Sequence, residues 1–192
     1  MNPTHAIDLV TGYLDRVHLS SARAVADIQV SNLLTRPEMR SSTGYAADTP
    51  FNKSLHWAVC LHEASHAVVF RSFGTPVNLA KVVPTCGGFI EHETEPNLLS
   101  DAIGTLAGVM AELIWGVEPT REAEFSSSAD VLLVARKISD HKKLSIDNRT
   151  VATLTFAIVT SRWNEIMSVA GGLRVCGSLT GAEIDLICRS PS

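Results

Sequence analysis

The stretch "SLHWAVCLHEASHAVVF", residues 54–70, decides how this chain folds. Within it, His62 and His66 are four positions apart, and Glu63 follows the first histidine. Residues four apart lie on the same face of an α-helix, with Cβ atoms about 5–6 Å apart. Two imidazoles in this arrangement can share one tetrahedral Zn²⁺ at about 2.0–2.1 Å from each nitrogen. The spacing therefore predicts a helix that binds zinc through two histidines.

Glu63 points in a different direction from the two histidines. One step along a helix rotates a side chain by about 100°, so we do not expect Glu63 to be a third ligand. It can instead reach a water molecule in the open position of the metal, which is the geometry of a general base. The sequence therefore predicts metal-assisted hydrolysis with Glu63 as the catalytic residue.

The competing interpretation is that His62 and His66 are structural and bond to neighbouring backbone or carboxylate groups. Flanking residues such as Val59, Leu61 and Val68 make this helix apolar nearly all round, so we expect it to be buried. Two adjacent buried imidazoles without a partner are costly. A metal ion removes that cost, and the zinc interpretation is therefore favoured.

Composition restricts the class of protein. The chain has 192 residues, of which 45% are hydrophobic and 19% charged, and its net charge is -4. No run of basic residues exceeds Lys142-Lys143, so no nucleic-acid partner is expected. The first thirty residues lack the apolar core of a secretory signal, and no segment approaches 18 consecutive apolar residues. Four cysteines without a CxxC pair fit reduced thiols. These features predict a soluble, cytoplasmic protein with no membrane span.

The chain divides at one plausible boundary. Residues 4–34 have the apolar spacing of one amphipathic helix or two, and residues 35–52, rich in Ser, Thr, Pro and Gly, are typical of a linker. We therefore predict an N-terminal helical extension and linker over 1–50, of unknown role, and a single domain over 51–192. In that domain Ser54 is expected to cap the histidine helix.

The rest of the domain is predicted to be mostly helical. Residues 77–84 and 88–93 have the pattern of a two-stranded hairpin. The histidine helix is expected to end at Gly74, and further helices are expected to begin at Ser100 and at Ser126. One long helix is predicted over 150–170 and ends at Gly171-Gly172, and a capping box from Thr180 to Glu183 precedes a final short helix. The predicted fold class is mainly α with a small β-hairpin.

A catalytic zinc takes three protein ligands and leaves a fourth position for water. Three acids compete for the third place, namely Glu112 in "LAGVMAELIWG", Asp130 in "SSSADVLLVARK" and Asp185 in "TGAEIDLIC". Spacing alone does not choose among them.

Several segments, taken in order, resemble one family. "LHEASHAVVF" is similar to the "HEAGHAVV" helix of the peptidase domain of FtsH-type proteases. "LAKVVPTCGGF", "LAGVMAELIWG", "SSSADVLLVARKI" and "SLTGAEIDLI" resemble later segments of that domain in the same order. The resemblance covers residues from about 55 to 189. It implies a zincin-like metallopeptidase domain built around the HExxH helix.

The resemblance also implies roles for the three acids. Asp130 falls on the family's third ligand, and Glu112 matches a glutamate near the metal helix, so we expect it to orient a ligand histidine or serve as the alternative ligand. Asp185 copies the letters of the ligand motif at the wrong end of the chain, where the capping box explains them. Two departures are Ser65 in place of a glycine and Ser126–Ser128 in place of Thr-Gly.

The function implied is that of a zinc endopeptidase. The chain contains no GxxxxGK[ST] phosphate loop, so we expect it to cleave unfolded or flexible polypeptides without an ATPase of its own. The strand at 88–93 can pair with an extended substrate, and His92 is a candidate oxyanion contact. Expected partners are the polypeptide substrate and either a second copy or a separate unfoldase or adaptor. The alternative is a catalytically silent, zinc-stabilised binding module; an intact Glu63 favours the enzyme.

Overall fold

The computed structural model describes residues 2–24, 50–83, 87–116, 123–140 and 146–189, with side chains described outside 16–24, 50–56, 123–129 and 139–140. The described elements are α1 (Pro3–Ala24), α3 (Pro50–Ser72), β1 (Val77–Val83), β2 (Gly87–His92), α4 (Leu98–Trp115), α5 (Ala123–Asp140), α6 (Asn148–Ser161), α7 (Trp163–Cys176), β3 (Ser178–Thr180) and α8 (Gly181–Arg189). The prediction of a mainly helical protein with a small sheet is confirmed.

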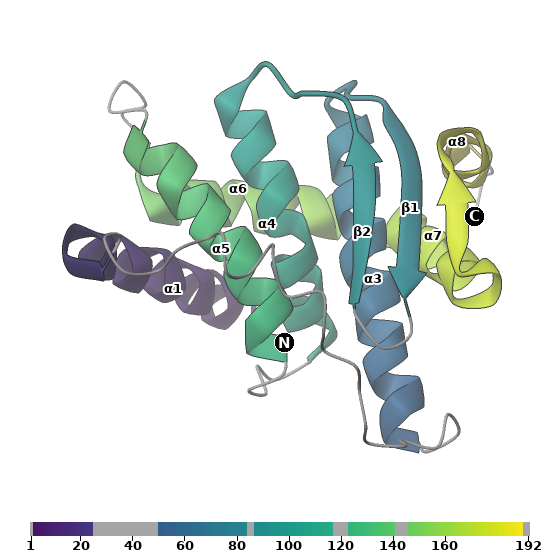
Figure 1. The fold of residues 1–192 in the computed structure, drawn as a ribbon, viewed down its shortest axis with the longest axis horizontal. Coiled ribbons are helices and arrows are strands. Elements are labelled where there is room, and N and C mark those ends of the chain that lie inside the picture. The colour runs from purple at the N-terminus through teal and green to yellow at the C-terminus, as the bar shows by residue number, and fades with distance from the viewer. Residues whose placement is uncertain (1, 25–49, 84–86, 117–122, 141–145, 190–192) are drawn as a thin grey trace.

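α3 is the central helix of the fold. It packs against α4 on one side and α7 on another, and the strands β1 and β2 lie over it (Figure 1). Every residue from 60 to 70 is buried, as the apolar flanks of the histidines predict. The helix begins at Pro50, where a proline is tolerated in the first turn. The predicted cap at Ser54 is therefore wrong, whereas the stop is confirmed, because Gly74 has a φ of 86°.

The sheet has three antiparallel strands in the order β2-β1-β3. The predicted hairpin is confirmed, with Val83 opposite Gly87 and Lys81 opposite Phe89. The third strand was not predicted. It is only three residues long, too short for an alternating pattern, and it forms because α7 ends at Gly177, whose φ is 74°. β2 lies at one edge of this sheet.

α4 is buried over the continuous stretch Ala102–Leu113. It begins one turn earlier than Ser100 suggests, because the Asn97 side chain accepts hydrogen bonds from the backbone N–H groups of Leu99 and Ser100. In length and composition α4 is the described helix that resembles a membrane span, but 67% of it is buried inside the protein, and core helices of soluble proteins pass the same test. The absence of a membrane span stays a prediction.

Two other predicted boundaries are wrong. α5 begins at Ala123 rather than at Ser126. The single helix predicted over 150–170 is two helices that meet at Arg162, where φ is -106° and ψ is 14°. Gly171 and Gly172 lie inside α7, because packing overrides the intrinsic cost of about 1 kcal/mol for a helical glycine. At Gly172 a Cβ atom would lie 3.0 Å from Leu179, so the glycine allows β3 to approach.

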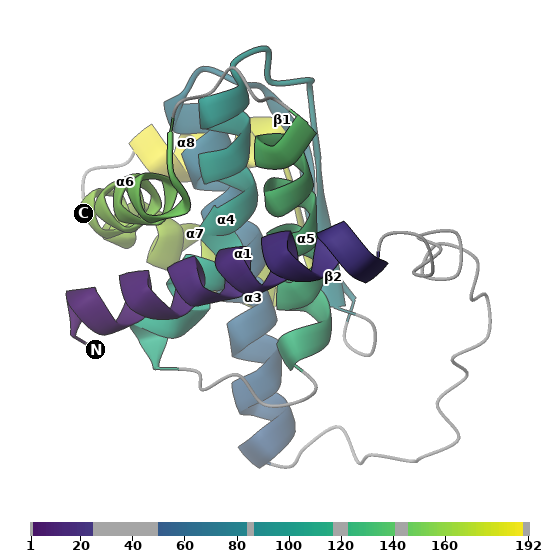
Figure 2. The same cartoon turned by 90° about the vertical axis from the view of Figure 1, so that its left-hand side faces the viewer.

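α1 belongs to the same core as the histidine helix. Ala6, Val10 and Leu14 are fully buried in the cluster that includes the apolar residues of α3 and α4. Figure 2 shows α1 running across α4 and α5. The linker predicted over 35–52 lies outside the described residues as far as 49, and its last three residues are the first turn of α3.

Candidate metal centre

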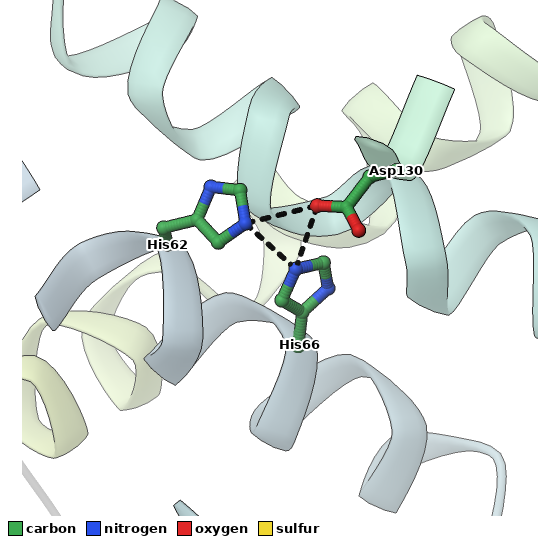
Figure 3. Close-up of side chains that lie close together, drawn as sticks. All are labelled: His62, His66 and Asp130. Carbon is green, nitrogen blue, oxygen red and sulfur yellow. Dashed lines mark hydrogen bonds and ion pairs between the residues drawn. The ribbon is translucent and has the colours of Figure 1, made fainter. Parts of the chain in front are cut away.

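Three side chains converge at the middle of α3. His62 Nε2 and His66 Nε2 are 2.9 Å apart, and Asp130 Oδ2 lies 3.0 Å from the first and 3.3 Å from the second. Both histidines come from α3 and the aspartate comes from α5, and α4 packs against both of these helices (Figure 3). Both histidines are buried, and the aspartate side chain is 19% exposed. The predicted set of His62, His66 and Asp130 is therefore assembled in space.

The donor set of this cluster calls for a cation. The ring nitrogen Nδ1 of His66 donates to the Gly104 carbonyl at 2.8 Å, so its Nε2 presents a lone pair when the ring is neutral. His62 has its Nδ1 3.2 Å from the carboxylate of Glu112, and its Nε2 also faces the centre. The carboxylate of Asp130 only accepts. Three acceptors at this separation repel one another unless a proton or a metal ion lies between them.

The spacing of the three atoms also fits a small ion. A tetrahedral zinc with ligand bonds of about 2.0–2.1 Å holds its ligand atoms about 3.3–3.4 Å apart. The observed separations of 2.9, 3.0 and 3.3 Å are close to this value and slightly shorter. A small outward movement of the side chains brings them to it. The group His62, His66 and Asp130 can therefore hold a metal ion.

The electrostatics of the cluster favour positive charge at its centre. Burial by itself lowers the pKa of His62, but the carboxylates of Glu112 and Asp130 outweigh it and raise that pKa well above its ordinary value. Burial alone likewise raises the pKa of Asp130, but the neighbouring His66 and His62 rings hold it well below its usual range. Both directions indicate that the site stabilises a cation.

Glu112 lies behind His62 rather than in the ligand group. Its Oε1 is 3.2 Å from His62 Nδ1, on the side of the ring that faces away from His66. The Nδ1 atom has no well-aligned hydrogen bond, so this contact is an ion-pair approach rather than an ideal bond. A carboxylate in this position fixes the tautomer and orientation of a ligand histidine. The structure thus places Glu112 where orientation of His62 is expected.

Glu63 lies beside the metal-ligand group and beneath the sheet. It is buried, and a Cβ atom added at Gly88 would come within 2.5 Å of its Cγ. The first residues of β2 therefore lie directly on the Glu63 side chain. Burial raises the pKa of this carboxyl above its ordinary value, although His62 and His66 oppose the shift. A carboxyl with a raised pKa beside such a group has the properties of a general base.

Two glycines of α4 contribute to the site, and neither was singled out from the sequence. A Cβ atom at Gly108 would lie 2.6 Å from ring atoms of both His62 and His66, and one at Gly104 would lie 2.6 Å from the ring of Phe70. Their spacing of four puts both on the face of α4 that meets α3. This spacing is the signal that was present in the sequence. Gly108 makes the room that the two imidazoles occupy.

Ser65, which stands where the resembling peptidase motif has a glycine, lies in an undisturbed part of the histidine helix. It is fully buried, and its hydroxyl donates to the Leu61 carbonyl at 2.7 Å. The polar atom is therefore satisfied within α3 itself, one turn back along the helix.

The remaining candidates lie away from the cluster. The ring of His92 stacks on Phe70 with centroids 4.1 Å apart, and its Nδ1 donates to the Glu93 carbonyl. It lies at the opposite end of β2 from Gly88, so the structure does not bring it to the metal ligands. Asp185 pairs with Arg71 near the end of α3 and lies outside the metal-ligand group.

Together, the fold and the site define a mainly helical protein with a buried group of two histidines and one aspartate that can hold a metal ion. No protein-family model matches the chain, and no curated protein is significantly similar to it. The family resemblance of its motifs therefore stays a hypothesis.

Proposed function

We propose that this protein is a zinc-dependent endopeptidase of the FtsH-like, zincin type, which hydrolyses peptide bonds in unfolded or flexible polypeptides. The observation that carries the proposal is the position of Glu63. A buried carboxyl with a raised pKa lies next to three converging metal ligands and directly under a strand at the edge of the sheet. A metal site with a purely structural role has no need of this carboxyl.

The metal would be held by His62, His66 and Asp130, with Glu112 orienting the ring of His62. When bound, Zn²⁺ supplies a Lewis acid that polarises the scissile carbonyl and lowers the pKa of a water molecule towards about 7. Zinc is favoured over magnesium or calcium because two imidazole nitrogens are poor ligands for those hard cations.

Glu63 performs the proton transfers of the proposed reaction. Its carboxylate takes a proton from the attacking water and returns it to the nitrogen of the leaving amine. The raised pKa brings the carboxyl closer to working pH, where a group can both accept and release a proton. Gly88 covers Glu63 with backbone only, so a substrate can approach the carboxylate without meeting a side chain at that position.

The edge of β2 suggests how a polypeptide is held. The Val82 N–H donates to the Gly177 carbonyl, on the β3 side of β1, so Lys81 and Val83 direct their backbone groups towards β2. Phe89, opposite Lys81, then faces β1, and Gly88 and Ile90 direct their N–H and C=O groups to the outer edge. An extended peptide can add to this edge through its main chain, which requires little of its sequence.

The experiment pairs metal analysis with peptide cleavage. We expect one zinc per chain and cleavage of unfolded casein, with Glu63→Gln retaining the zinc and the fold but losing activity by about 100-fold or more. Asp185→Asn is the matched control and should cleave as the wild type does. Wild-type protein that holds zinc but does not cleave, with Glu63→Gln indistinguishable from it, would support the silent binding module instead. The predicted partners and cytoplasmic location stay predictions.

A further inference from the structure

The helix that carries Asp130 is supported differently from the helix that carries the two histidines. α3 packs against α4, α7, β1 and β2, so it is held from several directions. α5 makes extensive contact, within the described part of the chain, with only α4 and α1. The direction in which Asp130 points therefore depends on these two supports.

The polar support from α4 acts near the C-terminal end of α5. Lys137 Nζ lies 2.6 Å from Asp101 Oδ2 and 3.3 Å from the Thr105 hydroxyl, both on α4. Lys137 is seven residues, or about two helical turns, beyond Asp130. This polar attachment fixes the later part of α5 to α4, and apolar side chains are buried in the part of the helix next to Asp130.

The support from α1 is an apolar stripe. Its three fully buried residues, Ala6, Val10 and Leu14, are four apart and so lie on one face of the helix. α1 packs extensively against α5, whose Val131 and Val134, one and four residues beyond Asp130, are buried in the same core as this stripe. In Figure 2, α1 crosses both α4 and α5.

α1 is itself fixed at its other neighbour. The carboxylate of Asp8 accepts from Arg149 at 2.8 Å, and that of Asp15 accepts from Asn148 at 2.8 Å. Both partners lie in the first turn of α6, which packs against α4 and α1. α1 thus connects α6 to α5, and α5 is held by α1 as well as by α4.

We propose that α1 is a positioning element of the metal centre, and that Leu14 and Val10 hold α5 at the rotation that brings the Asp130 carboxylate to His62 and His66. The inference rests on the proposed metal site, but it concerns a segment that has no part in the resemblance to the peptidase family. It gives the helical part of residues 1–50 a role. Without α1, the two histidines keep their places and the third ligand loses its own.

The test compares two buried leucines. Leu14→Ala removes a fully buried side chain from α1, and Leu179→Ala removes a buried side chain from β3, which packs against β1, α7 and α8 and not extensively against α5. Zinc affinity is measured on each folded protein by competition with a chromophoric chelator. We expect Leu14→Ala to weaken zinc binding by about tenfold, as for other groups that orient a ligand. Leu179→Ala should lower the melting temperature and leave zinc affinity unchanged.

Two further variants separate positioning from general loss of structure. Val10→Ala makes a smaller cavity and decides the question where Leu14→Ala does not fold; its zinc affinity should fall in the same direction. In an Asp130→Asn background, Leu14→Ala should have no additional effect, because the ligand that α1 positions is already lost. Co²⁺ in place of zinc should show an altered visible spectrum in Leu14→Ala and an unaltered one in Leu179→Ala.

The outcomes distinguish this inference from the metal site itself. Wild-type protein that binds no zinc contradicts the proposed function. If the wild-type protein binds zinc but Leu14→Ala and Leu179→Ala change the zinc affinity equally or not at all, only the role of α1 is overturned. An additive effect of Leu14→Ala in the Asp130→Asn background also overturns it, since the helix would then act through the histidines.

Discussion

Two aspartates, Asp130 and Asp185, contact basic side chains at different positions along α3. Asp130 belongs to the candidate metal site, whereas Asp185 forms an ordinary ion pair. Asp130 lies 3.0 Å from His62 and 3.3 Å from His66, in a largely buried position. Asp185 pairs with Arg71 and lies within 4.0 Å of Arg189, with 38% of its side chain exposed. The pair Asp185–Arg71 is complete in itself, because a guanidinium is always charged and only donates.

The environment of Asp130 is incomplete by comparison. Its neighbours are imidazoles whose Nδ1 atoms face Glu112 and the Gly104 carbonyl, so when both rings are neutral their Nε2 lone pairs point towards the carboxylate. A carboxylate beside two acceptors needs a cation, and a carboxylate beside a guanidinium does not. The difference teaches that the partner offered by α3, rather than the letters around the aspartate, decides which acid is a metal ligand.

The largest expected effect is on zinc affinity, and it tests the difference between the two aspartates directly. Asp130→Asn should weaken zinc affinity by at least about 10–100-fold, the loss typical of disturbing even a group that only orients a ligand. Asp185→Asn should leave the affinity unchanged, because its partner is Arg71. The measurement is a chelator-competition titration of both variants. The reverse order would show that the collinear resemblance is misleading, and loss of the metal from Glu112→Gln alone would make Glu112 the third ligand.

A second prediction concerns the room available to the histidines. Gly108→Ala places a Cβ atom 2.6 Å from ring atoms of both His62 and His66, so the rings must move. Overpacking of this kind costs about 1–3 kcal/mol in the free energy of unfolding, and zinc affinity should fall with it.

Gly171→Ala is the matched control for that change. Gly171 lies inside α7, and no atom lies within 4 Å of a Cβ added there. The same substitution should therefore stabilise the protein by about 0.5–1 kcal/mol and leave zinc affinity unchanged. Denaturant titration and zinc titration of the two variants check both statements. Equal effects at the two glycines would mean that the histidines do not depend on Gly108.

The two regions also differ in how well the sequence predicts them. The pair His62 and His66 was predictable from spacing alone, because the helix period dictates that they share a face. Asp130 was not, because it lies 64 residues beyond His66 and reaches the histidines through the packing of α3 and α5 against α4, and only the order of motifs singled it out. Gly108 was missed for the same reason. The apolar spacing of α1 was predicted, but its packing against α5 was not, since that depends on a distant element.

Helix boundaries follow the same rule. The cap at Thr180 was predicted correctly because capping is a local hydrogen-bond pattern, and both of its bonds are present. The break at Arg162 was not predictable, because the sequence there contains neither glycine nor proline. Gly171 and Gly172 suggested a stop that tertiary packing overrides. Sequence reasoning therefore succeeds where an interaction spans a few residues and fails where distant elements decide.

The smallest expected effect sharpens the interpretation of the Asp185 segment as a helix cap. The Glu183 carboxylate accepts at 2.7 Å from both the backbone N–H and the hydroxyl of Thr180, and these bonds lower its pKa. A carboxyl whose pKa is lowered on folding stabilises the folded protein at pH values above its pKa in the unfolded chain, which is about 4.5. That stabilisation is lost as the pH falls through the pKa of the folded state. Glu183→Gln should therefore melt at a slightly lower temperature than the wild type at pH 7, and the difference should shrink at pH 3.5.

Melting curves at the two pH values, with zinc present and then removed by a chelator, provide the measurement. The difference between the two proteins should be the same with and without zinc, because a cap at the start of α8 has no contact with the metal ligands. A difference that disappears when zinc is removed would connect this segment to the metal site and would contradict the distinction between the two aspartates.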